Sequence, residues 1–399
     1  MNRPLSGLRV IDLTRALAGP FTTMALADLG ADVIKIEPTP NGDMIRQWGP
    51  FDGETSVYYL SANRNKRSLG LDFRSPEGIE LLKRIALKAD IVVENFKVGT
   101  MESMGLDYTT LSALNPKLIL ASISGFGSEG PAKSWPGFDQ IAQGYSGLMS
   151  VTGTSDSGPT RVGVPVGDTT AGLWMCVGVL AAVIERNKTG KGQHVQTSLL
   201  SSLLSFLSVQ GQRYLSLNEV PARMGNGHPV IFPYGSFMTA DGLINIAPAT
   251  PAMWEKVCEL LGLSHLLTDD RFLTNAGRVQ HRQVLQDEFD RALSVADRKT
   301  WTDLFLANGV PAGPINTIED ALNDQQVNAM RMVESINYPG LGEVKHVGLP
   351  LELSSIPKGE SIYSAAPSLG ENSVEVLLEL GWDQQTIDAF ITKHVIHQA

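Results

Sequence analysis

Asp168 is the residue whose type and setting best suit chemistry, and it follows a short loop of proline and glycine, residues 163–167. An apolar run at residues 171–184 predicts a helix, with Asp168 near its positive end. There the ionised carboxylate is favoured, and the small Gly167 leaves room for a bulky reactant. This setting predicts a carboxylate nucleophile. The alternative is an N-cap, whose side-chain oxygen accepts amide protons of the helix.

Length, composition and net charge limit the number of domains and the class of ligand that we expect for this protein. Its 399 residues, 43% of them hydrophobic and 19% charged, suffice for a large core and predict two domains. A net charge of -10 argues against nucleic acid or an anionic membrane surface as the general partner. Any anionic ligand must therefore meet a local group of basic residues.

The compartment is inferred from three further features. Cys176 and Cys258 lie in apolar, helix-like stretches, which indicates buried thiols in a reducing environment. The first residues have no hydrophobic signal region, and the apolar run at 171–184 is shorter than a bilayer span. We expect a cytoplasmic protein without a membrane partner.

The first half of the chain alternates short β-branched runs with amphipathic segments. Ser75-Pro76 is a good helix start, with a capping serine and a proline in the first turn. Strands are expected at 10–13, 33–36, 91–93 and 118–124, and helices at 21–29, 76–88 and around Leu111. This order predicts an α/β fold with a Rossmann-like parallel sheet.

The character of the chain changes beyond its middle. A Leu/Ser-rich helix is expected at 197–217, then a loop at 225–229, a hairpin at 234–247 and mainly helices at 252–308. Strand-like sequence returns from Tyr338 to Val347, and helices at 373–380 and 384–393 end the chain. We expect a large domain at 1–200, a helical linker at 201–224, a smaller α+β domain at 225–330 and a return segment at 331–399 that completes the large domain.

The turn after the first strand gives little support for a dinucleotide. Residues 14–20 contain one glycine, Gly19, whereas the dinucleotide fingerprint needs several at close spacing. Arg15 in this turn suggests a side chain that grips phosphate, or equally a surface salt bridge. The sequence has no Walker lysine motif and no Cys/His group with zinc spacing, so no metal site is expected.

Six basic residues fall in segments that look like loops beside the strand ends, where open α/β sheets bind ligands. Each alone is explained by solvated surface charge, but together they favour an anionic ligand. They are Arg46, Arg64, Lys66, Arg67, Arg74 and Lys97.

Eight segments, in this order and spacing, carry a specific resemblance to a known family. They are residues 5–13, 18–20, 29–37, 42–43, 65–68, 93–96, 167–168 and 189–193. With them the chain resembles, from about Leu5 to Phe390, the class III CoA-transferases. This is the family of formyl-CoA transferase and L-carnitine CoA-transferase, and it also contains α-methylacyl-CoA racemase.

The resemblance implies a two-domain α/β subunit that forms a ring, two rings being interlocked in a homodimer. The CoA thioester is then a substrate, with no tightly bound cofactor. Asp168 matches the family's catalytic aspartate, which attacks an acyl-CoA to form a mixed anhydride and then carries CoA as an aspartyl thioester. Such an exchange conserves thioester energy and needs neither ATP nor metal.

The resemblance also assigns the CoA contacts. They are Arg15, Ala16, Leu17 and Ala18; Leu71, Asp72, Phe73 and Arg74 around the adenine; Asn95, Phe96 and Lys97; and Gly137, Phe138 and Asp139. Two phosphate-binding arginines of the formyl-CoA enzyme are replaced here by Pro38 and Ser103. Phosphate binding must then rely on other cations, such as Lys97 or Arg74.

The acid substrate is indicated by one loop. Residues 225–229, followed by 232–235, resemble the loop of family members that use dicarboxylates, such as succinyl-CoA with glutarate or itaconate. His228 and Arg46 are accordingly the expected substrate contacts, although His228 can equally serve to stabilise its loop. The glycine-rich active-site loop of the formyl-CoA enzyme is missing, which disfavours oxalate.

Two alternatives to the transferase remain. A racemase of the same fold abstracts an α-proton with a histidine and an aspartate, but Phe138 stands where that histidine belongs. A non-catalytic CoA-binding protein would not need the intact Asp168. The sequence therefore favours CoA transfer from an acyl-CoA to a carboxylic acid, in particular a dicarboxylate.

Overall fold

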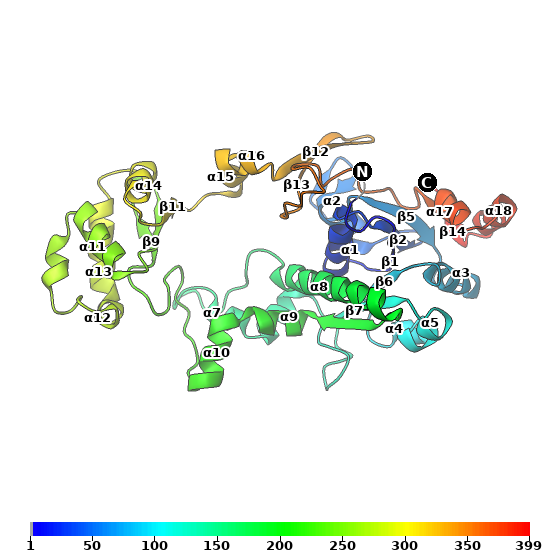
Figure 1. The fold of residues 1–399 in the computed structure, drawn as a ribbon, viewed down its shortest axis with the longest axis horizontal. Helices are drawn as coiled ribbons and strands as arrows, with labels where there is room; N and C mark the ends of the chain where they lie inside the picture. Colours follow the sequence, from blue (N-terminus) through cyan, green and yellow to red (C-terminus); the bar gives the residue numbers. More distant parts are fainter. Residues whose placement is uncertain (1–2) are drawn as a thin grey trace. The chain divides into compact units, whose positions relative to one another are not determined.

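The structure is a computed structural model that describes residues 3–399 (Figure 1). Its central feature is a seven-stranded sheet in the order β14-β5-β2-β1-β6-β7-β8. All neighbouring strands are parallel except β14, which pairs antiparallel with β5. The strands are β1 (Arg9–Asp12), β2 (Asp32–Pro38), β5 (Lys66–Leu71), β6 (Ile91–Glu94), β7 (Ile119–Ser124), β8 (His194–Ser198) and β14 (Ile396–His397).

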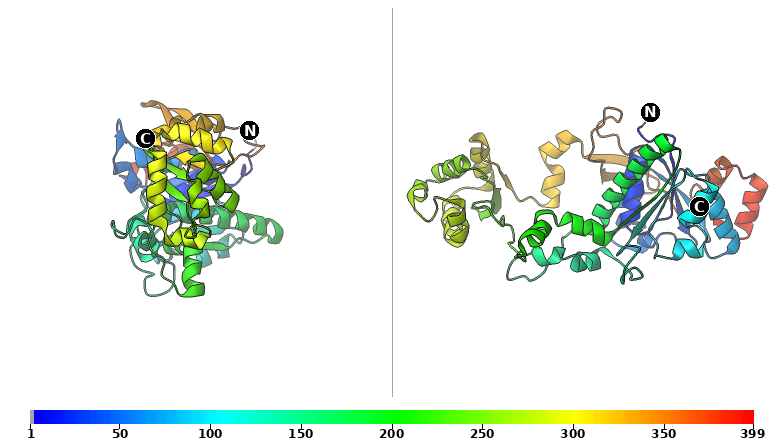
Figure 2. Two further views of the ribbon diagram at one scale, coloured as in Figure 1. Left: turned by 90° about the vertical axis from the view of Figure 1, so that its left-hand side faces the viewer. Right: turned by 60° about the horizontal axis from the view of Figure 1, so that its bottom comes forward.

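Helices cover both faces of this sheet, so its strands are hydrophobic on both sides. One face packs with α1 (Ala18–Asp28) and α8 (Val166–Thr189). The other shares a core with α3 (Pro76–Ala86), α5 (Tyr108–Leu114), α17 (Ser373–Glu379) and α18 (Gln384–Thr392), as Figure 2 also shows. The predicted α/β fold with a parallel sheet is confirmed.

The helix caps follow the local sequence. The Ser75 side chain accepts a hydrogen bond from the Gly78 amide at 3.0 Å, and Pro76 begins α3, as predicted. The single long helix predicted at 197–217 is wrong. Ser198 ends β8 and caps α9 (Leu199–Phe206), and a positive φ of 48° at Ser208 separates α9 from α10 (Ser208–Leu217).

Contacts divide the chain into two compact units. The first comprises residues up to 149, 161–220 and 325–399, and the second comprises 150–160 and 221–324. The first also holds the helices α2 (Val57–Asn63), α4 (Thr100–Ser103), α6 (Asp139–Tyr145) and α16 (Gln325–Met330) and the 3-10 helix η1 (Met44–Gln47). Its two further strand pairs are β3 (Phe51–Asp52) with β4 (Thr55–Ser56) and β12 (Val333–Tyr338) with β13 (Gly342–Val347). The short helix α7 (Leu148–Val151) contains the boundary between the two units.

The second unit has its own core around a three-stranded sheet. The hairpin predicted at 234–247 is confirmed as β9 (Gly235–Met238) and β10 (Leu243–Ile246), which also pairs with β11 (Ala312–Pro314). Its helices are α11 (Pro251–Leu260), α12 (Asn275–Gln280), α13 (Arg282–Leu293), α14 (Arg298–Ala307) and α15 (Ile318–Asn323), with the 3-10 helix η2 (Ser264–Thr268). Phe237, Trp254 and Phe289 pack together in its core.

Two expectations concern buried and apolar segments. Cys176 and Cys258 are both buried free thiols, as predicted, and burial raises the pKa of each to about 12. Helix α8 extends beyond the apolar run at 171–184, and by length and composition alone it could cross a membrane. One face of α8 packs on α1, α9 and β8, and core helices of other proteins meet the same criterion.

Candidate active site

The strand order creates a switch point between β1 and β6, from which the chain winds in opposite directions. In such sheets ligands bind at the carboxyl ends of the strands beside this point. The two loops that leave these strands are tied together there. The Arg15 amide donates to Asn95 Oδ1, and Asn95 Nδ2 donates to the Arg15 carbonyl oxygen, both at 2.8 Å.

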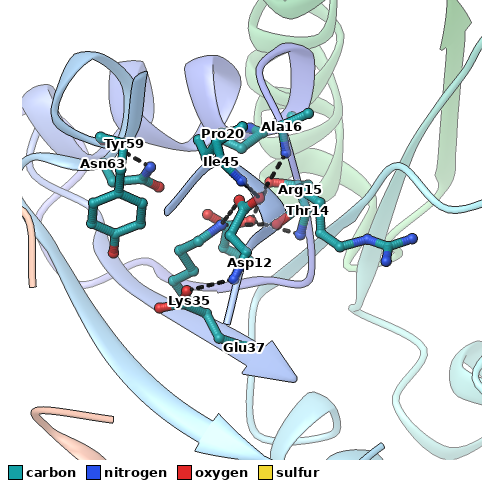
Figure 3. Close-up of polar contacts among 12 residues, drawn as sticks. Asp12, Thr14, Arg15, Ala16, Pro20, Lys35, Glu37, Ile45, Tyr59 and Asn63 are labelled. Atoms are coloured by element: carbon teal, nitrogen blue, oxygen red, sulfur yellow. Dashed lines mark hydrogen bonds and ion pairs between the residues drawn. The ribbon is translucent and has the colours of Figure 1, made fainter. Parts of the chain in front are cut away.

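Buried charged side chains hold the loop after β1 through hydrogen bonds to its backbone. Lys35 Nζ bonds both Asp43, at 3.0 Å, and the carbonyl oxygen of Thr14, at 2.8 Å. Asp43 also accepts the amide of Ala16 at 3.1 Å. Figure 3 shows the Arg15 side chain directed away from this group, so the network holds the loop and leaves the guanidinium on the outside.

Opposite charges keep these buried groups ionised. Burial works to raise the pKa of Asp12, but Lys66, at 3.0 Å, and Lys35 outweigh it and hold that pKa well below its usual range. Burial likewise works to lower the pKa of Lys35, and Asp43 and Asp12 reverse the effect. Removing one partner of such a pair leaves an uncompensated buried charge, which costs about 3–5 kcal/mol.

Asp168 lies in a cavity of about 550 Å³ beside the switch point. Eight of the expected CoA contacts line the same cavity: Arg15, Ala16, Leu17, Ala18, Asn95, Gly137, Phe138 and Asp139. The sequence analysis missed other residues of the wall, among them Met44, Trp48, Tyr58, Gln140 and Arg161. Two of these residues carry a local signal: Gln140 directly follows the expected contact Asp139, and Arg161 is a charged residue just before the Pro/Gly loop.

The Asp168 carboxylate has an unusual electrostatic setting. It is the third residue of α8, whose N-cap is Pro165, so the prediction of Asp168 as the N-cap is wrong. Burial, and then repulsion by Asp139, raise the pKa of Asp168 to about 7. This reverses the expectation that the helix end favours its ionised form, because removal from water and a second carboxylate outweigh the helix dipole.

Asp139 also fixes the loop that presents Asp168. Its Oδ1 accepts the Gly167 amide at 2.7 Å, and its Oδ2 accepts Gln143 Nε2 at 2.7 Å. Gln143 Oε1 in turn accepts the Val162 amide at 2.9 Å. A side chain on Gly167 would meet Asp139 and Leu203 at about 3 Å, so only glycine allows this close approach.

Other expected CoA contacts lie outside this cavity. Leu71 is fully buried in the core, Phe73 packs against that core, and the exposed Arg74 donates its amide to Asp72 Oδ1. Phe96 and Lys97 line a neighbouring cavity of about 350 Å³, which shares the wall residues Ile123 and Ser124 with the first. The guanidinium of Arg15, which lines the first cavity, lies 5.3 Å from the centre of the ring of Phe96, which lines the second. The two cavities therefore meet at this contact.

Arg46 is engaged within the protein. Its Nε and Nη2 donate to the two carboxylate oxygens of Glu37, each at 2.7 Å, and Nη2 also reaches Tyr59 Oη at 2.6 Å. The guanidinium therefore has a bidentate partner already and does not line the cavity around Asp168.

The six basic residues do not form one anion-binding group. Arg64 pairs with Asp28 at 2.7 Å, Lys66 with Asp12, and Arg67 with Asp32 at 2.7 Å. Among residues 3–399, only Arg74 and Lys97 of the six form no ion pair. That interpretation of the group was wrong, because four of its six members already pair with acidic residues of the same unit.

His228 belongs to the second unit and is held by its own loop. Its Nδ1 accepts the Val230 amide at 3.2 Å, and its ring lies 4.8 Å from that of Tyr234. Arg282 donates to the His228 carbonyl oxygen at 2.7 Å. When the imidazole is neutral, this arrangement places its proton on Nε2, which is then a hydrogen-bond donor. Among residues 3–399, no group of His, Cys, Asp and Glu is arranged to hold a metal ion.

Solved structures and curated proteins similar to this chain point to one family. A CaiB/BaiF family protein from Brucella suis is 39% identical, with a TM-score of 0.85 and coverage of 95% of this chain and 100% of that one. A succinate–glutarate CoA-transferase of Agrobacterium fabrum is 39% identical over 96% of this chain and 97% of its own length. A succinyl-CoA:mesaconate CoA-transferase of Haloarcula hispanica is 40% identical over 94% of this chain and 96% of its own length.

The family model gives the same result. The model for CoA-transferase family III matches residues 5–373. That match covers most of the chain, including both loops at the switch point and Asp168. The chain therefore belongs to CoA-transferase family III and is a CoA-transferase, an enzyme whose substrates are CoA thioesters.

Proposed function

We propose that the enzyme moves CoA from an acyl-CoA such as succinyl-CoA to a dicarboxylic acid such as glutarate, with Asp168 as the nucleophile. One observation carries the proposal. Asp168 and eight of the residues expected to contact CoA line a single cavity beside the switch point of the sheet. The carboxylate thus lies where a thioester would lie if CoA followed the strand ends.

Four substitutions complete the reaction. The Asp168 carboxylate attacks the thioester carbonyl, the C–S bond breaks, and a mixed anhydride and the CoA thiolate form. The thiolate attacks the Asp168 carbonyl and releases the donor acid, which leaves an aspartyl thioester. The acceptor carboxylate then attacks this thioester, whose C–S bond breaks, so that a second anhydride and the CoA thiolate form. The thiolate attacks the acceptor's carbonyl, which yields the new acyl-CoA and frees the Asp168 carboxylate. No step needs a proton.

The side chains around Asp168 support its role as a nucleophile. A carboxylate with its pKa raised to about 7 is more basic than an ordinary aspartate, and so a stronger nucleophile once ionised. The backbone amides of Val162, in the loop before α8, and of Gly167, in its first turn, are both held by side chains, which restricts the carboxylate to a narrow range of positions. Such restriction is how an enzyme makes a weak nucleophile effective.

CoA binding is proposed at the strand ends, with Arg15, Arg74 and Lys97 facing its phosphates. Arg15 and Lys97 follow β1 and β6 at the switch point, and Arg74 follows β5. Because Pro38 and Ser103 carry no charge, these three cations take the place of the family's arginines.

Two observations support a dicarboxylate as the acid. Relatives of the chain are named for succinyl-CoA with glutarate or mesaconate, all dicarboxylic acids. In the second unit, His228 offers an Nε2–H donor that suits a free carboxylate. A screen of acyl-CoA donors against mono- and dicarboxylic acids, with detection of the new acyl-CoA, tests the proposal.

The same screen separates the alternatives. Transfer to no acid, together with exchange of the substrate's α-proton into solvent, would favour the racemase. Binding of CoA without either reaction would favour a non-catalytic protein.

We also propose the interlocked homodimer. Helix α10 has no buried residue, yet it exposes large apolar side chains such as Val209 and Leu215, 73% and 78% exposed. Leu173, Trp174 and Val177 form a further exposed apolar patch on α8. Contiguous apolar surface of this kind usually marks a protein interface. Sedimentation of the purified enzyme as a dimer supports the assignment, and a stable monomer contradicts it.

The cytoplasmic location remains a prediction.

A further inference from the structure

Arg161 lines the same cavity as Asp168 and has almost no partner within the protein. Its one hydrogen bond runs from Nη2 to the Gly163 carbonyl oxygen, at 3.4 Å. Among residues 3–399, no carboxylate forms an ion pair with it. Since a guanidinium carries five N–H donors, most of its hydrogen-bonding capacity is unused.

The backbone next to Arg161 is held in place although its side chain is exposed. The Val162 amide is fixed by Gln143, and the Gly167 amide by Asp139. Arg161 and Asp168 therefore lie at the two ends of one anchored segment, the loop and the first turn of α8, and line one cavity. A substrate bonded to Asp168 lies within a space that this arginine also borders.

The charges in the cavity explain why a cation is needed there. Asp139 and Asp168 already place two carboxyl groups on the wall, and their repulsion contributes to the raised pKa of Asp168. A dicarboxylate that reacts through one end brings a further negative charge with the other. Without a counter-charge, this charge would be repelled from a partly dehydrated site.

Two arginines line this cavity, and neither forms an ion pair within residues 3–399. They differ in their position. Arg15 lies over the Phe96 ring, and its backbone is tied to Asn95 at the switch point, where the CoA phosphates are proposed. Arg161 lies in the segment that leads to Asp168. Its guanidinium can donate two parallel N–H bonds to the two oxygens of one carboxylate.

We infer that Arg161 receives the second carboxylate of the acid substrate and selects dicarboxylates over monocarboxylates. The inference rests on the proposed function and adds the residue that determines specificity. Arg161 takes no part in bond making. It binds the end of the acid that does not react, so it acts on the affinity and position of the acid.

The test compares two acceptors of equal length in the Arg161→Gln variant. Glutarate carries a second carboxylate, whereas its monoamide, 5-amino-5-oxopentanoate, carries a neutral amide of nearly the same shape. We expect kcat/KM for glutarate to fall about 10- to 100-fold, the usual range for a lost charge-assisted contact, and kcat/KM for the monoamide to change less than about threefold. Arg161→Lys should recover part of the loss, because it restores the charge without the planar fork.

Two controls accompany this comparison. The affinity for free CoA should stay unchanged in Arg161→Gln, which distinguishes a carboxylate contact from a phosphate contact. Arg291→Gln removes an exposed arginine that pairs with Glu288 in the second unit, and it should alter neither acid's kinetics.

The outcomes separate the two hypotheses. Equal losses for glutarate and the monoamide, or a loss of CoA affinity with unchanged acid preference, would overturn the role of Arg161. If wild-type enzyme transfers CoA to no acid, the proposed function itself fails. If the wild type transfers CoA and Arg161→Gln keeps the full preference for glutarate, only the present inference fails.

Discussion

Asp139 accepts the Gly167 amide at 2.7 Å, and this bond places a carboxylate beside the first turn of α8, which carries Asp168. The same side chain anchors the loop and contributes to the raised pKa of Asp168. Asp139 therefore influences both the position and the pKa of Asp168, the proposed nucleophile.

The pH dependence of the reaction should reveal this coupling. Because Asp168 attacks as the carboxylate and its pKa is raised to about 7, kcat/KM should increase as the pH rises through about 7 and then level off. Asp139→Asn removes the neighbouring charge while keeping an oxygen for Gly167, so the midpoint should move to lower pH. An unchanged or higher midpoint in that variant would show that Asp139 does not influence the nucleophile.

A covalent adduct on Asp168 is expected during turnover. Incubation with an acyl-CoA donor should leave an intermediate that hydroxylamine or borohydride traps and that peptide mass spectrometry places on Asp168. Asp168→Ala and Asp168→Asn should abolish adduct and turnover, whereas Asp156→Asn, a change in an exposed loop, should preserve both. Full turnover in Asp168→Ala would exclude the mechanism.

Asp168→Asn should also fold at least as stably as wild type. A folded-state pKa raised above its unfolded value means that the ionised form opposes folding, an effect that is complete above about pH 7 and disappears below the unfolded pKa, about 4. The variant should therefore gain stability at pH 8, on the order of 1–2 kcal/mol, with little difference near pH 3. Thermal unfolding at the two pH values measures this change, and a loss of stability at pH 8 would contradict it.

The cations proposed for CoA should control its affinity. Replacing Arg15, Arg74 or Lys97 by a neutral residue should weaken acyl-CoA binding by about 1–3 kcal/mol and reduce its dependence on salt. Calorimetric titration at two ionic strengths provides the measurement, with Arg291→Gln as the matched control. If all three single variants bind CoA like wild type, other residues must hold the phosphates.

His228 should affect the acid rather than the common chemistry. His228→Ala should lower kcat/KM for a dicarboxylate such as succinate or itaconate, because the Nε2–H donor is lost, while the Asp168 adduct from a monocarboxylic acyl-CoA forms almost normally. Equal losses for both classes of acid would instead indicate a role in the fold or in the shared steps. A wild-type preference for monocarboxylates would remove the dicarboxylate assignment.

Much of the local structure was predictable because its causes are local. The serine cap at Ser75, the hairpin turn at Asp241-Gly242 and the alternation of strands and helices all depend on neighbouring residues. The helix after the Pro/Gly loop was likewise evident, and with it the position of Asp168 near a helix start. The segments shared with a known family extended this to the chemistry of the chain.

Only the tertiary structure decided which charges remain available for a ligand. Arg46 and Arg67 appear in the sequence as free cations, yet they bind Glu37 and Asp32, both on strand β2. Arg46 also reaches the Pro367 carbonyl oxygen, 321 residues away. The pKa of Asp168 likewise depends on burial and on Asp139, 29 positions earlier in the chain. Pairing and desolvation arise from distances in space, and a linear pattern does not contain those distances. The sequence therefore determined the elements and indicated Asp168 as the proposed nucleophile. The fold determined the protonation of Asp168 and, within residues 3–399, left Arg161 and Arg15 without an ion pair beside it.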